Sequence, residues 1–168
     1  MASLKVLTYP DPVLARKSEP LVEITDEIRN LAQDMLETMY ENRGIGLAAP
    51  QVGKNVRLIT VDLSGPERRE EPKVYVNPAI VAKEGETETE EGCLSVIGYR
   101  SLVKRAAWVS FTAQDLEGET VELEADDLLA VCLQHELDHL DGVLFIDHIS
   151  RLKRALYENR LRKWKKKK

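Results

Sequence analysis

A His-Glu-x-x-His motif near the C-terminal end is the arrangement of residues in this chain that could do chemistry. His135 and His139 are four residues apart, so on an α-helix both imidazoles lie on one face and can bind one metal ion. Glu136 would lie beside that ion, where its carboxylate can act as a general base for a metal-bound water. The motif therefore predicts a hydrolytic metal site. It still requires a helix, a third ligand and donors for a developing oxyanion.

The third ligand must come from outside the motif. The metalloprotease pattern that continues His-x-x-Gly-x-x-His is excluded, because its last position is Phe145 here. Cys93 is the better candidate. It follows Gly92, where an acidic segment can bend, and a thiolate with two imidazoles leaves one metal position open for catalysis. Two alternatives stay open: a metalloendopeptidase that uses Glu158, and a structural zinc site that Cys132 closes.

The segment that contains the motif has the features of a buried helix. Asp126 offers an N-cap and Gly142 a C-terminal stop, which predicts a helix from about Asp126 to Asp141. Its apolar residues form two adjacent stripes, so two sides of the helix should be buried. On this helix Cys132 faces the same cavity as His135, and we interpret it as part of the lining.

A glycine-rich segment, residues 43–53 (RGIGLAAPQVG), is the second place where chemistry is expected. It is not a phosphate-binding loop, because it has neither the glycine spacing nor the Lys-Ser/Thr of a Walker motif. Gly44 and Gly46 allow the backbone to approach a ligand or another strand closely. Gln51 is the one polar side chain with reach inside the segment.

The rest of the chain predicts helices at both ends of a β-rich middle. Residues 8–20 read as an extended arm, and Thr25 or Asp26 can cap a helix through about Asn42. Ser150 can cap a terminal helix with Leu152, Leu156 and Leu161 on one side. Between these helices the pattern predicts five strands: Arg57–Leu63, Lys73–Ala82, Thr87–Val96, Arg105–Ala113 and Glu119–Ala125.

The composition is that of an ordinary globular domain. The chain has 168 residues, of which 32% are charged and 43% apolar, which suits one domain over residues 1–168. There is no apolar run of about 18 residues, so we expect no membrane partner. The N-terminus lacks the features of a signal or transit peptide, and two cysteines are too few for a disulfide scaffold. We therefore predict a cytoplasmic protein.

The charge is distributed unevenly along the chain. Residues 151–168 contain ten Lys or Arg and one Glu, about +9, whereas the remainder contains 14 basic and 28 acidic residues, about −14. A basic C-terminal helix and tail, about residues 150–168, therefore suggests a polyanionic partner. One hypothesis is contact with ribosomal RNA or an acidic ribosomal protein. A solvated helix end is the alternative, and it stays open.

Three segments in a fixed order resemble one known family. They are GIGLAAPQ (Gly44–Gln51), EGCLS (Glu91–Ser95) and QHELDH (Gln134–His139). Together with the early Tyr9-Pro10-Asp11-Pro12, they make the chain resemble peptide deformylase through nearly its whole length. One departure is Ile97, where the family usually has proline, and it bears on the local loop shape and on substrate preference.

The resemblance implies a fold, an activity and partners. The expected fold is α+β, with antiparallel or mixed sheets packed around the central motif helix, an N-terminal helix and a C-terminal helix. The expected activity is hydrolytic removal of the N-formyl group from the initiating methionine of newly synthesised polypeptides, with release of formate. N-formylmethionyl nascent peptides would be the substrates, and we expect no DNA partner.

The resemblance also implies roles for individual residues. Glu136 would be the general acid and base, while the Gln51 side chain and the Leu94 backbone N–H would form the oxyanion hole. Arg105 would pair with the carboxylate of Glu91. The expected metal ligands are Cys93, His135 and His139. The expected lining for the methionine side chain is Ile45, Gly46, Leu94, Leu128, Val131 and Cys132.

The nature of the metal depends on which argument is used. Nitrogen and sulfur ligation alone suggests zinc. The resemblance implies one iron(II) ion per chain, with nickel, cobalt or zinc as substitutes. Either metal would suit hydrolysis, because a bound metal ion lowers the pKa of water from 15.7 toward about 7.

Overall fold

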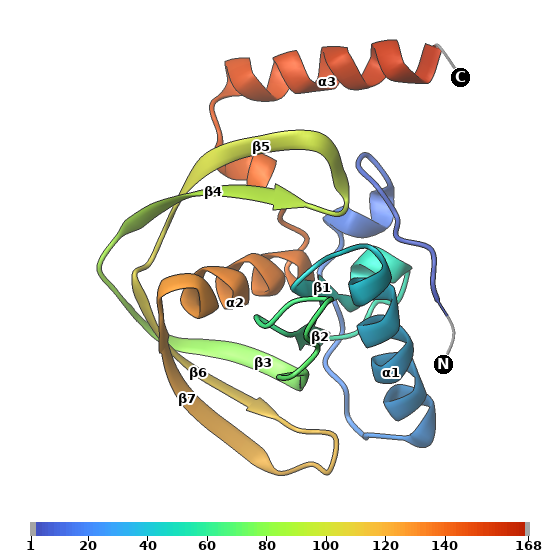
Figure 1. Cartoon of the computed structure of the whole chain (residues 1–168), viewed down its shortest axis with the longest axis vertical. Helices are drawn as coiled ribbons and strands as arrows, with labels where there is room; N and C mark the ends of the chain where they lie inside the picture. Colours follow the sequence, from blue (N-terminus) through green and yellow to red (C-terminus); the bar gives the residue numbers. More distant parts are fainter. Residues whose placement is uncertain (1–2, 167–168) are drawn as a thin grey trace.

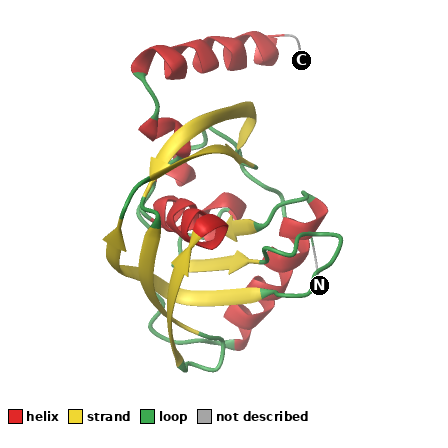
Figure 2. Ribbon diagram, turned by 60° about the vertical axis from the view of Figure 1, so that its left-hand side comes forward, coloured by secondary structure: helices red, strands yellow, loops and turns green. Residues whose placement is uncertain are grey.

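The motif lies on a central helix, α2 (Asp127–Leu140), in a computed structural model that describes residues 3–166. Strands lie on both sides of this helix (Figures 1 and 2). Asp126 occupies the N-cap position, although its side chain accepts no capping hydrogen bond. Gly142 follows the helix with φ 77°, which ends it as predicted. Leu133 and Leu140 are fully buried, so this is the buried helix that the sequence predicts.

A five-stranded antiparallel sheet covers one side of α2. Its order is β1-β2-β3-β6-β7. In β6 the alternate residues Val109, Phe111 and Ala113 are buried against α2, whereas the residues between them are less buried. The strands are β1 (Gly46–Ala48), β2 (Leu58–Val61), β3 (Lys73–Glu84), β6 (Trp108–Gln114) and β7 (Thr120–Asp126).

A separate two-stranded sheet covers the other side of α2. It consists of β4 (Thr87–Cys93) and β5 (Val96–Arg105), which are antiparallel. The predicted single strand Thr87–Val96 is wrong, because the chain turns tightly after Cys93, which pairs with Val96. The predicted strand Arg105–Ala113 is also wrong at its start, since Arg105 is the last residue of β5. Burial alternates along the second half of β5, where Ser101, Val103 and Arg105 are buried and Leu102 and Lys104 are exposed, but the residue types do not follow that alternation.

Two further helices pack outside these layers. In α1 (Asp26–Glu41), Met35 and Met39 are fully buried against β1 and β2, and Thr25 Oγ1 accepts a hydrogen bond from the Ile28 N–H. Thr25 is one of the two residues predicted as the cap. α1 ends at Glu41, followed by the C-cap Asn42.

The C-terminal helix, α3 (Arg151–Lys166), extends beyond the rest of the molecule (Figure 1). Ser150 Oγ accepts a hydrogen bond from the Lys153 N–H, as predicted for a cap. Of the three predicted leucines, Leu161 is partly buried beside the buried Tyr157. The prediction is wrong for the other two, because Leu152 and Leu156 are exposed. Only one side of α3 meets the body, and Tyr157 is rotated away from those leucines around the helix. Lys167 and Lys168, the end of the predicted tail, lie outside the described residues.

The N-terminal arm, residues 3–20, runs along the body with one 3-10 helix, η1 (Pro12–Ala15). Its Leu14 is buried in a cluster with residues of β5 and of η3. The element η3 (Phe145–His148) is a 3-10 helix that follows α2. A third 3-10 helix, η2 (Ala49–Val52), follows β1 and contains Gln51. No helix within residues 3–166 is long and apolar enough to span a bilayer.

Candidate active site

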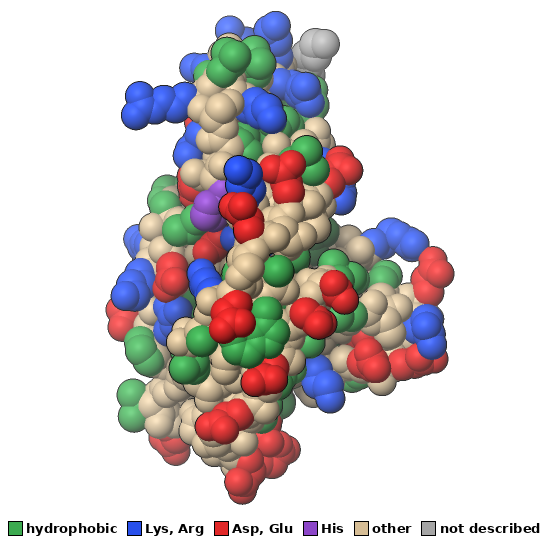
Figure 3. Space-filling view, turned by 90° about the vertical axis from the view of Figure 1, so that its left-hand side faces the viewer, with side chains coloured by type: hydrophobic (Ala, Val, Ile, Leu, Met, Phe, Trp, Pro, Cys, Tyr) green, Lys and Arg blue, Asp and Glu red, His purple; other side chains and the backbone are tan. Residues whose placement is uncertain are grey.

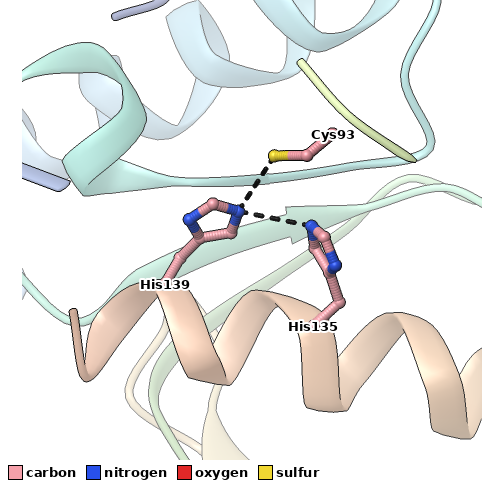
Figure 4. Close-up of side chains that lie close together, drawn as sticks. All are labelled: Cys93, His135 and His139. Atoms are coloured by element: carbon pink, nitrogen blue, oxygen red, sulfur yellow. Dashed lines mark hydrogen bonds between the residues drawn. The ribbon is translucent and has the colours of Figure 1, made fainter. Parts of the chain in front are cut away.

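Three side chains from two elements converge in the structure. His135 and His139 come from successive turns of α2, and Cys93 comes from the end of β4 (Figure 4). The two Nε2 atoms are 3.3 Å apart, and the Cys93 Sγ is 3.3 Å from Nε2 of His139. One potential ligand atom from each of the three residues lies within 4.8 Å of the others.

This geometry fits a metal ion. Ligand atoms about 2.0–2.3 Å from a tetrahedral ion lie roughly 3.3–3.6 Å from one another, and the observed separations are close to that. Nδ1 of His135 lies 2.9 Å from Oε1 of Glu91, which favours the tautomer with its proton on Nδ1. That tautomer leaves the Nε2 lone pair free for a metal. Burial lowers the pKa of His139 well below its usual value, which keeps this imidazole neutral. Although burial opposes protonation of His135, its hydrogen bonds to Cys93 and Glu91 instead raise its pKa well above the usual value.

Glu136 lies beside this cluster under the backbone of β1. Its side chain is only 4% exposed, and burial raises the pKa of the carboxyl to about 7. Its Oε1 atom has no hydrogen-bond partner among residues 3–166, so it is free to act on a bound molecule. A Cβ added at Gly46 would lie 2.3 Å from Glu136 Oε2. A side chain at Gly46 would therefore displace the Glu136 carboxylate from its position beside β1.

The Gln51 amide has a defined orientation at the same place. Gln51 is 2% exposed, and its Oε1 accepts a hydrogen bond of 3.0 Å from the Ala48 N–H. Its Nε2 donates to Ser95 Oγ at 3.0 Å and lies 3.6 Å from Cys93 Sγ. The oxygen is thus held away from the cluster and the NH2 group is held next to Cys93. Leu94 follows Cys93 in the turn between β4 and β5.

A cavity of about 650 Å³ opens onto these groups. All six residues that the sequence analysis expects as lining lie around it, namely Ile45, Gly46, Leu94, Leu128, Val131 and Cys132. Leu128 is 54% exposed, so it lies at the mouth. Three further residues line the cavity that were not predicted from the sequence: Arg43, and Tyr99 and Arg100 of β5. Recognition of β5 as a strand would have placed the last two.

Comparison with known proteins assigns the family. The family profile described as polypeptide deformylase matches residues 3–155. The chain belongs to the polypeptide deformylase family. It is therefore a hydrolase, and the resemblance found in the three motifs is confirmed.

Solved structures of the family agree with this assignment. A peptide deformylase from Legionella pneumophila is 44% identical, with a TM-score of 0.92 over 98% of this chain and 96% of that one. The enzyme from Thermus thermophilus is 41% identical, with a TM-score of 0.86 over 95% and 94%. The one from Synechococcus elongatus, solved in complex with actinonin, is 40% identical, with a TM-score of 0.89 over 95% and 88%. The expected α+β deformylase fold is confirmed.

The rival ligands lie outside the cluster in this family member. Glu158 accepts a hydrogen bond of 2.7 Å from the Tyr9 hydroxyl and pairs with Arg154 on the preceding turn of α3. Cys132 lines the cavity, and burial raises the pKa of its thiol well above the usual value. Ile97 does not line this cavity. It lies in an apolar hollow between β5 and α3.

A buried network of charged residues, Glu91, Arg105 and Asp138, contacts His135 through Glu91. Arg105 donates two hydrogen bonds of 2.8 Å to Glu91, from Nε and Nη2, and a third of 2.5 Å from Nη1 to Asp138. Although burial opposes ionisation, these bonds lower the pKa of Glu91 to about 2. His148 reaches the network through Asp138, with its Nε2 2.9 Å from Oδ2. The sequence signal for Glu91 and Arg105 was the family resemblance alone.

Replacement of Arg105 by methionine is expected to lower the free energy of unfolding by about 3–5 kcal/mol, because it leaves the buried Glu91 carboxylate without its cation. Urea unfolding would measure the change. The matched control is Arg100→Met on the same strand. Arg100 pairs at 3.5 Å with the exposed Glu90, and its loss should change the free energy by less than about 1 kcal/mol. Equal changes in the two variants would show that the network contributes no more than a surface pair.

Proposed function

We propose that the chain removes the formyl group from the N-terminal formylmethionine of newly synthesised polypeptides and releases formate. The observation that carries this proposal is the cluster of Cys93, His135 and His139, of which Cys93 and His135 line a cavity. Glu136 lines the same cavity, and its Oε1 has no partner among the described residues. Membership of the deformylase family supports it. Because nascent chains are made in the cytoplasm, we propose the cytoplasm as the location.

Cys93, His135 and His139 would hold one divalent ion, for which we propose iron(II), with zinc, nickel or cobalt as substitutes. When bound, the ion would supply Lewis acidity and make a water nucleophilic near neutral pH. The Glu91–Arg105 pair would orient His135, as carboxylates behind a ligating histidine commonly do.

The remaining steps belong to residues of the chain. The Glu136 carboxylate would take a proton from the attacking water and later deliver it to the departing methionine nitrogen. Negative charge would develop on the formyl oxygen, where the Gln51 Nε2–H and the Leu94 backbone N–H would donate hydrogen bonds. The methionine side chain would occupy the apolar part of the cavity, against residues such as Val131 and Cys132.

A formate-release assay tests this function. Chain purified without oxygen and loaded separately with each of the four metals should release formate from short formyl-Met peptides, and mass spectrometry should show that the peptide loses only its formyl group. Acetyl-Met peptides are the control and should be unchanged. Cleavage at an internal peptide bond would instead support the endopeptidase, and no formate with any metal would refute the proposal.

Replacement of Gln51 by alanine is expected to lower kcat about 10²- to 10³-fold, because one preorganised oxyanion donor is lost. KM should change little, since the hydrogen bond strengthens as charge develops on the oxygen. Steady-state kinetics on a formyl-Met peptide would measure both. Metal content and melting temperature, determined on the same sample, control for damage to the cluster. A kcat within about threefold of the starting value would remove Gln51 from the oxyanion hole.

We further propose that the basic face of α3 contacts the ribosome. Lys and Arg side chains gather around α3, whereas Asp and Glu predominate on the body below it (Figure 3). Lys163, Lys165 and Lys166 lie in the last turns of the helix. Phosphate contacts made by such a surface would weaken strongly as salt rises.

Cosedimentation with ribosomes tests this contact. The full chain should sediment with ribosomes at low salt and be released as salt rises, whereas a chain that ends at Tyr157 should not bind. A second variant, with Lys163, Lys165 and Lys166 replaced by glutamine, retains the rest of α3 and should lose most of the binding. Equal sedimentation of all three proteins would show that α3 is a solvated helix end.

A further inference from the structure

The N-terminal arm joins the two segments that carry the proposed oxyanion donors. The Leu7 N–H donates a hydrogen bond of 2.7 Å to the Gln51 carbonyl, and the Tyr9 N–H donates one of 2.8 Å to the Ser95 carbonyl. These two N–H groups are two residues apart, the spacing at which successive groups of an extended chain point to the same side. The arm therefore holds η2 and the turn that follows β4 at a set separation.

The same separation determines the geometry of the Gln51 amide. Gln51 comes from η2, whereas Leu94 and Ser95 come from the turn after β4, with Ser95 44 residues later in the chain. Ser95 is fully buried, and its hydroxyl accepts the 3.0 Å hydrogen bond from Gln51 Nε2. A shift of either segment would alter the angle between the two oxyanion donors, and small displacements at reacting groups have large effects on rate.

The side chain of Tyr9 attaches the arm to α3. Its hydroxyl donates a hydrogen bond of 2.7 Å to Oε1 of Glu158 and accepts one of 3.4 Å from Nη2 of Arg154. The Arg154 guanidinium also lies 5.8 Å from the centre of the Tyr9 ring. Arg154 is held in turn by a salt bridge to Asp147. The Tyr9 side chain therefore has partners on α3, while its backbone contacts the Ser95 carbonyl.

We propose that Tyr9 is a positioning residue for the deformylation reaction. By binding α3 through its hydroxyl, it fixes the arm, and the arm fixes Gln51 relative to the turn that contains Leu94 and Ser95. This inference rests on the proposed function, because it assigns Tyr9 an effect on the oxyanion hole. It makes α3 part of the catalytic framework, although α3 is far from Gln51 along the chain.

Kinetics of Tyr9→Phe test the proposal, because this variant keeps the ring and removes only the hydroxyl. We expect kcat to fall about 3- to 10-fold, because the variant loses about one hydrogen bond that stabilises the transition state. KM should stay within twofold of the starting value, and the metal content should be unchanged. Tyr40→Phe is the matched control. It removes a buried tyrosine hydroxyl bonded at 2.6 Å to Asp62, and it should lower the melting temperature while kcat stays the same. An unchanged kcat in Tyr9→Phe would overturn the proposal.

Variants of Glu158 check the same link from α3. Glu158→Gln retains an oxygen acceptor and should keep kcat within about twofold, whereas Glu158→Ala should reproduce the roughly 3- to 10-fold loss of Tyr9→Phe. If Glu158→Ala keeps full kcat, the attachment of the arm to α3 has no effect on the reaction, and the proposal fails.

A double-mutant cycle distinguishes positioning through Gln51 from general loosening of the structure. In the Gln51→Ala background, Tyr9→Phe should change kcat less than about twofold, since the amide that it positions is absent. Additive losses would overturn the inference and leave the proposed function intact. If Gln51→Ala alone kept full kcat, the failure would lie in the proposed oxyanion hole instead.

Discussion

Replacement of Cys93 by serine is expected to abolish metal binding and formate release together. The thiolate is the only anionic ligand in the Cys93, His135 and His139 set, and a serine hydroxyl stays protonated and binds metal poorly. Loss of a residue that merely supports a ligand commonly reduces metal affinity about 10- to 100-fold, so loss of a ligand should exceed that. We expect less than about 0.1 metal ion per chain and a fall in kcat/KM of more than about 10³-fold.

Metal analysis of purified variants, together with the formate assay, measures this effect. Cys132→Ala is the matched control, since Cys132 is the other thiol near the site and lies outside the cluster. It should keep one metal ion per chain. Full metal content in Cys93→Ser, with loss in Glu158→Gln, would favour the endopeptidase arrangement, and loss in Cys132→Ala would favour the structural zinc site.

Replacement of Glu136 by glutamine should separate chemistry from metal binding. The substitution preserves the shape that fits beneath Gly46, but an amide cannot take a proton from water. We expect kcat to fall about 10²- to 10⁴-fold, the range for loss of a general acid or base, with metal content unchanged. Single-turnover formate release at saturating peptide is the appropriate measurement.

The metal content of the Glu136→Gln variant shows whether Glu136 is a ligand or a base. A glutamine variant that loses its metal would make Glu136 a ligand, and one that releases formate at the normal rate would remove it from the mechanism. Its position supports the role of base, because the carboxylate is buried, its pKa is raised to about 7 by burial, and one oxygen has no protein partner.

Local sequence was enough to predict the elements that carry the site. The apolar stripes around His135 and His139 predict a buried helix, and Gly142 predicts its end, because periodicity and helix termination depend on neighbouring residues. Cys93 was the favoured third ligand after Phe145 excluded one metalloprotease pattern, with Glu158 and Cys132 left as alternatives. The structure places that thiol 3.3 Å from His139, and the ligand roles themselves stay predictions.

The strand β5 and the buried face of α3 were predicted less well than the helix that carries the motif. β5 was missed because its residue types do not follow its alternating burial, whereas in β6 the alternate buried residues are all apolar. The packing face of α3 was wrong for two of its three leucines, for a related reason. Leucines indicate an apolar stripe, but the partner surface determines which stripe is buried, and here the arm and β5 select Tyr157.

The amino-acid sequence specifies the reactive residue types, the helix that holds three of them and the family to which the chain belongs. How these residues meet depends on tertiary structure. Gln51 and Ser95 are brought together across 44 positions, and Tyr9 and Glu158 across 149. Such contacts depend on how distant segments pair and pack, which no local periodicity records. The orientation of the Gln51 amide, and the link from Tyr9 to α3, could therefore be seen only in the folded chain.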